Sequence, residues 1–413
     1  MNLGTLPADW ERSTLAAVAA RQPNAIVDGP FGSSLKLSDY VETGVPVLQG
    51  KNITNDRFRW LDVRFISEAK ANELRRSATR VGDVLMVKIG SIGYSAVVES
   101  LHGFELAIIP ANLAKMTPDP ARVDTDYLHH WMRTATVKTY LQSSASKTAQ
   151  PALSLGKIRE LPLPLPPLPE QRRIAAILDQ ADTLRAKRRE ALAQLDSLTQ
   201  SIFMEMFGDY RDDEVRWPAR PMEEIAAETA IGLVRSAEQF GLDYAVPYVR
   251  MNAVGPHGEF LPNLVLRTDV TEDEFRRYQL RPGDFLFNTR NSRELVGKTA
   301  LFRELGPYVF NNNLMRIRFI DGVQPEYVAA AFQTPYIQRE LEIRKAGTTS
   351  VFAIYARELK TVPVPVPPWP LQQTFATRIQ SVESLKATHR AALAELDALF
   401  ASLQHRAFTG QLS

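Results

Sequence analysis

The chain contains 413 residues, 45% of them apolar and 23% charged, which is enough for two or three domains and excludes a single small one. It contains no cysteine, which excludes disulfides, thiolate nucleophiles and cysteine-bound metals; with no membrane-length apolar run and no secretory signal, we expect a cytoplasmic protein without a membrane partner. Forty-nine basic and 47 acidic residues leave a net charge of +2, so a polyanion would have to be bound by locally clustered basic side chains.

An internal repeat organises the chain. The proline-rich segment LPLPLPPLPEQ at 161–171 recurs as VPVPVPPWPLQ at 362–372, an offset of 201 residues that keeps all five prolines in register. The stretch that begins there, 161–207, shares 18 of 47 residues with 362–408. The chain is therefore predicted to consist of two homologous halves.

Each half combines a mixed region with a long helix. Residues 1–160 and 209–361 contain short β-type runs, turns and short helical patterns, which favours α+β domains. The following segments, 161–208 and 362–413, open with a proline run that can continue neither a helix nor a central strand. Helical patterns then run over about 170–206 and 371–407.

Apolar residues spaced three and four apart on both helices predict an antiparallel coiled coil. The predicted seam positions are Leu184, Arg188, Leu195 and Leu198 in the first helix and Leu385, His389, Leu396 and Leu399 in the second. Arg188 and His389 occupy the midpoints, so we predict a polar layer that specifies the register. The alternative is that both face solvent at the edge of the seam.

Motifs of catalysis are missing. The tripeptide Gly297-Lys298-Thr299 resembles the end of a phosphate-binding loop, but Ser292 stands where that motif requires glycine. The histidines show no metal-binding spacing, and His129 and His130 are adjacent, so they point apart. We therefore expect no catalytic residue, no metal site and no cofactor site, and a chain that binds rather than catalyses.

Several motifs together resemble the specificity subunit of type I restriction-modification enzymes. They are DGPFGSS at 28–34, GDVL at 82–85, GDFL at 283–286, the first proline run, FMEMFG at 203–208 and RAFTGQL at 406–412. The second half departs from the pattern, because IGLVRSAEQFG at 231–241 replaces the DGPFG form.

The resemblance implies two target recognition domains separated by two long antiparallel helices, each domain reading one half of a bipartite sequence in double-stranded DNA. The helices would hold the two readers at a constant distance. It also implies two modification (methyltransferase) subunits and restriction (endonuclease and translocase) subunits as partners, which methylate adenine and cleave unmodified DNA. S-adenosylmethionine, ATP and magnesium would bind those partners and not this chain. The alternative is a coiled-coil scaffold that organises proteins without reading DNA.

Candidate DNA contacts lie in loops, because residues 1–160 carry 19 basic and 16 acidic side chains and 211–360 carry 20 and 21. Basic, amide and hydroxyl side chains suit phosphates and base edges. In the first domain the candidates are Ser33, Ser34, Lys36, Lys51, Asn52, Lys88, Tyr94, Ser146, Lys147, Thr148 and Gln150. In the second they are Arg250, Asn252, Arg290, Asn291, Ser292, Arg293, Lys298, Lys345, Thr348 and Thr349. For each residue the alternative is a solvated polar loop.

Overall fold

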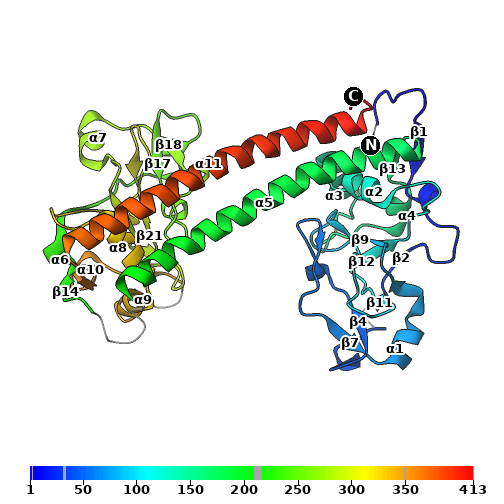
Figure 1. Ribbon diagram of the computed structural model, residues 1–413, viewed down its shortest axis with the longest axis horizontal. Coiled ribbons are helices and arrows are strands. Elements are labelled where there is room, and N and C mark those ends of the chain that lie inside the picture. The colour runs from blue at the N-terminus through cyan, green and yellow to red at the C-terminus, as the bar shows by residue number, and fades with distance from the viewer. Residues whose placement is uncertain (2, 31–33, 209–215, 348–349, 413) are drawn as a thin grey trace. The chain divides into compact units, whose positions relative to one another are not determined.

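The computed structural model describes residues 1, 3–30, 34–208, 216–347 and 350–412. It divides into two compact units, one formed by 1–188 with 392–413 and the other by 189–391. Each unit combines a mixed α/β domain with segments of the two long helices (Figure 1). The predicted α+β class with two long helices is confirmed.

The first unit contains two main sheets. One has the antiparallel order β10 (Ser95–Val97), β9 (Val84–Val87), β12 (Leu113–Met116), β2 (Ile26–Asp28). The other has the order β3 (Tyr40–Val41), β7 (Arg64–Ile66), β4 (Val45–Val47), β11 (Ala107–Ile108), β8 (Ala78–Thr79), with β4 and β11 parallel. Two-stranded pairs join β1 (Glu11–Thr14) to β13 (Pro162–Leu165) and β5 (Ile53–Thr54) to β6 (Arg57–Phe58). The short helices are α1 (Glu68–Glu73), α2 (Thr125–Met132), α3 (Ala135–Ser143) and α4 (Leu155–Arg159).

The second unit repeats this plan. Its main sheet has the order β15 (Ala226–Ile231), β23 (Leu314–Phe319), β19 (Phe285–Asn288), β21 (Thr299–Leu301). Another has the order β16 (Phe240–Gly241), β18 (Leu266–Thr268), β17 (Val246–Val249), β22 (Val309–Phe310). Smaller sheets pair β14 (Ala219–Pro221) with β26 (Pro363–Pro365), and β20 (Arg290–Asn291) with β25 (Phe352–Ala353) and β24 (Ala346–Gly347). The short helices are α6 (Met222–Ile225), α7 (Glu272–Tyr278), α8 (Pro325–Ala331), α9 (Pro335–Glu342) and α10 (Ala356–Lys360).

The repeated Gly-Asp motif builds the turn that leads into the central strand of each main sheet. Gly82 has a φ of +89° and Gly283 one of +94°, a backbone region that favours glycine. Asp83 accepts hydrogen bonds from the Arg80 N–H (2.9 Å) and from Lys115 Nζ (3.1 Å). Asp284 likewise accepts one from the Arg281 N–H at 2.8 Å. The motif is thus a structural turn that starts β9 and β19.

The two long helices, α5 (Leu168–Phe207) and α11 (Trp369–Phe408), contain 40 residues each. In the first unit Arg173 donates to the Leu412 carbonyl, and Arg185 Nε donates to Asp397 Oδ1 at 2.5 Å. Since the partner's number falls as the number along α5 rises, the two segments are antiparallel. In the second unit the ion pairs of Lys386 with Asp196, at 2.9 Å, and of Arg378 with Glu205, at 3.3 Å, give the same direction.

The predicted seam is wrong for four of its leucines. Four of its leucines are 40–52% exposed, namely Leu184, Leu198, Leu385 and Leu399, while Leu195 and Leu396 are half-buried. The buried side chains are Ile174, Leu178 and Ala181 in the first unit and Phe203, Phe375, Ile379 and Val382 in the second, of which Ile174, Ala181 and Val382 belong to the predicted apolar stripe. The heptad pattern assumed that the helices pack only on each other, whereas these residues also pack against the domain cores.

Ion pairs between the helices occur at repeat-related positions, because Arg185 and Lys386 are 201 residues apart, as are Asp397 and Asp196. Arg185 also lies over the Phe400 ring, 4.2 Å from its centroid. The contacts of Arg185 lie within the first unit, and the Lys386–Asp196 pair lies within the second. The polar layer of Arg188 and His389 stays a prediction.

A buried glutamine attaches each helix to its domain. Gln171 is fully buried; its Oε1 accepts from the Asp124 N–H (2.8 Å), and its Nε2 donates to the Pro166 and Arg122 carbonyls. Gln372 makes the equivalent three bonds, to the Gln324 N–H and the Pro367 and Gly322 carbonyls. The glutamine after each proline run therefore joins helix and domain.

Replacing Gln372 with alanine should destabilise the second unit. The change leaves three buried backbone groups without partners, and we expect a loss of about 2–4 kcal/mol in unfolding free energy. Chemical denaturation measures the loss, and Gln373→Ala, at the exposed neighbouring position, is the control. Equal stabilities of the two variants would contradict the assigned role of Gln372.

His129 in α2 makes the first unit sensitive to acid. Its Nε2 lies 3.2 Å from the Ser95 carbonyl oxygen, to which it donates. Burial, with help from the nearby Arg133 charge, lowers the pKa of His129 to about 3. The folded state therefore keeps the ring neutral at a pH where the unfolded chain, with a histidine pKa of about 6.5, already takes up a proton.

Stability should consequently fall as the pH is lowered from about 6.5 towards 3, by up to about 1.4 kcal/mol per pH unit for this one group. A His129→Gln variant, whose amide can still donate to Ser95, should show a shallower dependence in thermal unfolding between pH 7 and 4.5. An unchanged slope would contradict the neutral state of His129.

Candidate nucleic-acid interface

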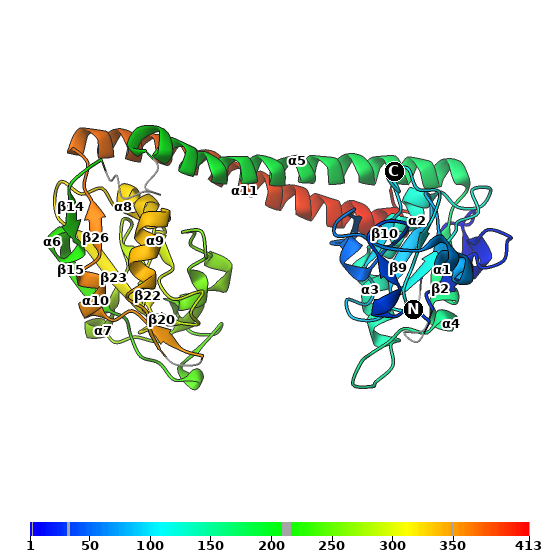
Figure 2. The ribbon, with the colours of Figure 1, turned by 90° about the horizontal axis from the view of Figure 1, so that it is seen from below.

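Two loops lie side by side in the second unit. Arg290 in β20 pairs with Ala353 in β25, and Lys345 Nζ donates to the Arg293 carbonyl at 2.7 Å. In Figure 2, β20 lies at the end of the unit away from α11. The structure thus brings together the predicted segments 290–293 and 345–347, which we call the second loop pair.

The first unit contains the equivalent arrangement. Ile89 forms a β-bridge with Ala152, and the Leu153 N–H donates to the Lys88 carbonyl at 2.9 Å. Ile89 and Ala152 are each 201 residues before Arg290 and Ala353. The segments 88–94 and 143–152, the first loop pair, therefore occupy the same place in the fold as the second pair.

The first loop pair presents hydroxyls and one lysine to solvent. Ser146 Oγ accepts from the Ala152 N–H at 3.0 Å, and Thr148 Oγ1 donates to the Gln150 carbonyl at 2.9 Å. Lys147, between them, is exposed and has no ion-pair partner among the residues that the structure describes. The hydroxyls shape the loop and leave the lysine available.

Two other predicted residues of this pair have partners inside the unit. Lys88 Nζ lies 2.6 Å from Asp28 Oδ2. The ring of Tyr94 has Lys138 Nζ 4.5 Å from its centroid, and that ammonium also pairs with Asp56 Oδ2 at 2.5 Å. Sequence reasoning missed Lys138 and Asp56, because they are 82 residues apart in the chain and belong to no motif.

The basic residues of the second loop pair differ in availability. Arg290 is exposed and, in the described part of the chain, has no acidic partner. Arg293 Nη2 and Lys345 Nζ both pair with Glu342, at 2.8 and 2.7 Å. The Asn291 amide donates to Asn288 Oδ1 and its oxygen accepts from the Ser292 N–H, so Asn291 shapes the loop.

Two predicted DNA contacts are wrong. Asn52 is fully buried and holds its own turn, accepting from the Gln49 N–H and donating to the Arg59 and Leu61 carbonyls. Lys298 Nζ donates to the Val254 carbonyl at 2.5 Å, and burial lowers its pKa. Both groups satisfy backbone atoms that would otherwise be unpaired, so neither is available to DNA.

The other predicted residues are distributed as follows. Ser34, Lys36, Lys51 and Asn252 are exposed, and Arg250 is half-buried with its guanidinium 5.1 Å from the Phe240 ring centroid. Ser33, Thr348 and Thr349 lie outside the described residues.

The departure of the second half from the DGPFG form preserves one glycine. The N–H of Gly29 donates to the Leu113 carbonyl and that of Gly232 to the Leu314 carbonyl, both at 3.2 Å. A Cβ on Gly29 would lie 2.1 Å from the Pro110 backbone, and one on Gly232 would lie 2.3 Å from the Asn311 carbonyl oxygen. Gly232 therefore occupies the structural place of Gly29, although the neighbouring side chains differ.

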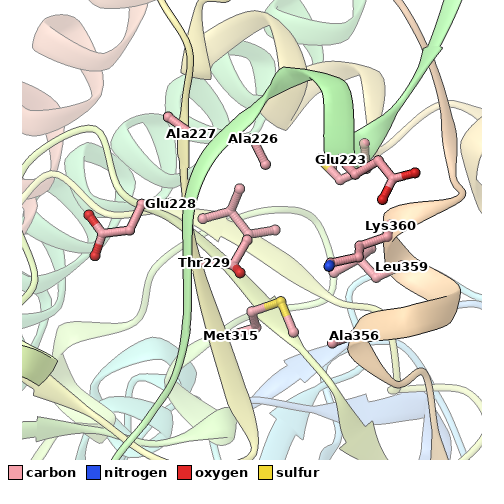
Figure 3. Close-up of a pocket in the computed structure, with 11 residues that line it drawn as sticks. Glu223, Ala226, Ala227, Glu228, Thr229, Met315, Ala356, Leu359 and Lys360 are labelled. Atoms are coloured by element: carbon pink, nitrogen blue, oxygen red, sulfur yellow. The ribbon is translucent and has the colours of Figure 1, made fainter.

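A pocket of 430 Å³ in the second unit has no part in the loop pair. Glu223 and Lys360 lie on one side of β15 and Glu228 on the other, above Met315 (Figure 3). The Glu228 carboxylate is bound by Arg316 and Arg318. Across the described ranges no cluster of histidine and acidic residues could hold a metal, and no helix is long and apolar enough to cross a membrane.

Both mixed domains thus contain an equivalent loop pair, and each unit contains antiparallel segments of the two long helices. A family model for the type I restriction modification DNA specificity domain matches residues 42–194. That domain model thus covers part of the first half of the chain, and the chain is similar over its full length to type I specificity subunits.

Relatives match over the full length. The type I restriction enzyme EcoKI specificity subunit of Escherichia coli K12 is 22% identical over 436 residues, covering 100% of this chain and 91% of that protein. The putative type I restriction enzyme MjaX specificity subunit of Methanocaldococcus jannaschii is 21% identical, covering 99% and 95%.

Solved structures show the same fold. The type I restriction-modification S subunit from M. genitalium aligns over 98% of both chains with a TM-score of 0.59 and 13% identity. A chain from a study of complex assembly and conformational transition in the type I R-M system aligns over 99% of this chain and 100% of that one, with a TM-score of 0.52 and 19% identity.

Proposed function

We propose that this chain is the DNA-reading subunit of a type I restriction-modification enzyme, in which each unit reads one half of a bipartite target. The observation that carries the proposal is the duplicated loop pair. The same two loops meet at equivalent places in both domains, yet they present different side chains. That is the arrangement expected of two readers with one scaffold and two sequences.

The chemistry belongs to partners. Two modification subunits methylate adenine with S-adenosylmethionine, and restriction subunits cleave DNA with ATP and magnesium. These three cofactors bind the partner subunits and not this chain. The nearly balanced charge of both halves supports this division, because neither half has a large excess of basic side chains to neutralise phosphates. Modification subunits then supply much of the phosphate contact.

Methylation mapping tests the function. DNA from cells that carry the chain with its modification subunits should show methylated adenines within two short sequences separated by a constant unspecified spacer. In binding assays the same complex should prefer that sequence over random duplex and lose affinity as salt rises. A scaffold that reads no DNA predicts neither preference nor a bipartite pattern, and that outcome would sink the proposal.

Arg290 should contribute to one half-site alone. Replacing it with alanine in the complex should weaken specific binding by about 5- to 100-fold and relax the preference at one position, as loss of an arginine contact to a base does. Arg281→Ala is the control, because Arg281 is exposed at the opposite end of β19. Equal effects of the two variants, or a change in both half-sites, would contradict the role of Arg290.

A further inference from the structure

The last residue of α9 contacts the second loop pair. Glu342 Oε1 accepts hydrogen bonds from Arg293 Nε (3.0 Å) and Nη2 (2.8 Å), and Oε2 pairs with Lys345 Nζ at 2.7 Å. The bonds from Lys345 and Arg293 hold the pKa of Glu342 below its ordinary value. One carboxylate thus binds a cation from each loop, while Glu294 attracts the same two cations less directly.

The first unit has a neutral contact at the same place. Helices α3 and α9 correspond at an offset of 200, shown by the capping residues Thr134 and Thr334, so Gln142 corresponds to Glu342. Gln142 Nε2 donates to the Ile92 carbonyl at 3.4 Å, and Ile92 is 201 residues before Arg293. In both units this helix end is therefore tied to the same point of the reading loop, by an amide in one and by a carboxylate in the other.

The geometry leaves part of Arg293 unused. Its Nε and one Nη2 hydrogen bond to Glu342, so the edge formed by Nη1 and the remaining Nη2 hydrogen stays available. The Phe352 ring lies 5.8 Å from the guanidinium carbon, and the side chain is 62% exposed. Two N–H groups on one edge of a guanidinium can bind O6 and N7 of guanine together.

We infer that Glu342 is a positioning residue that determines the selectivity of the second reader. It orients Arg293 towards a base edge and withholds Arg293 and Lys345 from indiscriminate phosphate contact, since a phosphate must compete with the carboxylate for both cations. This inference rests on the proposed function. The effect is confined to the second half-site, because the corresponding residue of the first unit, Gln142, carries no charge.

The test compares Glu342→Gln with Glu340→Gln in the complex with modification subunits. Glutamine has the shape of glutamate and is the residue that the first unit uses. Glu340 lies on the same helix and pairs with Arg344 at 2.6 Å, so its variant changes the net charge equally. Thermal unfolding checks that both variants are folded, and binding to specific and random duplexes is measured across a salt series.

We expect Glu342→Gln to bind random duplex about 3- to 10-fold more tightly at low salt, with a salt slope steeper by about one. Its preference for the specific sequence should fall about 10-fold, and only in the second half-site. Glu340→Gln should leave the preference unchanged. If the two variants behave equally and the unsubstituted complex is selective, the inference about Glu342 is overturned and the proposed function stands. If the unsubstituted complex shows no sequence preference, both are overturned.

Discussion

The fold depends on a fully buried glutamine at the start of each long helix. Burying an amide costs free energy unless its hydrogen bonds are made. Gln171 bonds to three backbone groups: the Asp124 N–H at the start of α2, the Arg122 carbonyl in the domain and the Pro166 carbonyl in the proline run. Tyr127 and Tyr327 add a hydroxyl bond to the carbonyls of Pro164 and Pro365. Because proline has a carbonyl but no N–H group, the proline runs carry more acceptors than donors, and these side chains satisfy some of the acceptors.

The architecture was predictable because the repeat is visible in the sequence and each of its parts has a local cause. Prolines end the domain, glycine forms the turn before the central strand, and apolar spacing reveals the long helices. The prediction of the seam residues was wrong because the exposure of Leu184 or Leu385 depends on which face of the helix packs against the domain. Sequence periodicity does not determine that tertiary contact.

The interface was predictable as loops and less so as residues. The repeat offset already pairs segment 88–94 with 289–295. Whether a lysine is available depends on groups distant in the chain, as when Lys298 binds the Val254 carbonyl 44 residues away. Glu342 was missed, although comparison of α3 with α9 at an offset of 200 would have set it against Gln142.

The first unit is not a continuous stretch of chain, because residues 392–413 join 1–188, whereas the second unit is formed by 189–391 alone. Phe400, Ala407, Phe408 and Leu412 complete the core of the unit that contains the N-terminal domain. During synthesis on the ribosome that core must wait, with its apolar surface uncovered, until residues 400–412 have emerged. The second unit can close first, so the order of folding should run against the order of translation.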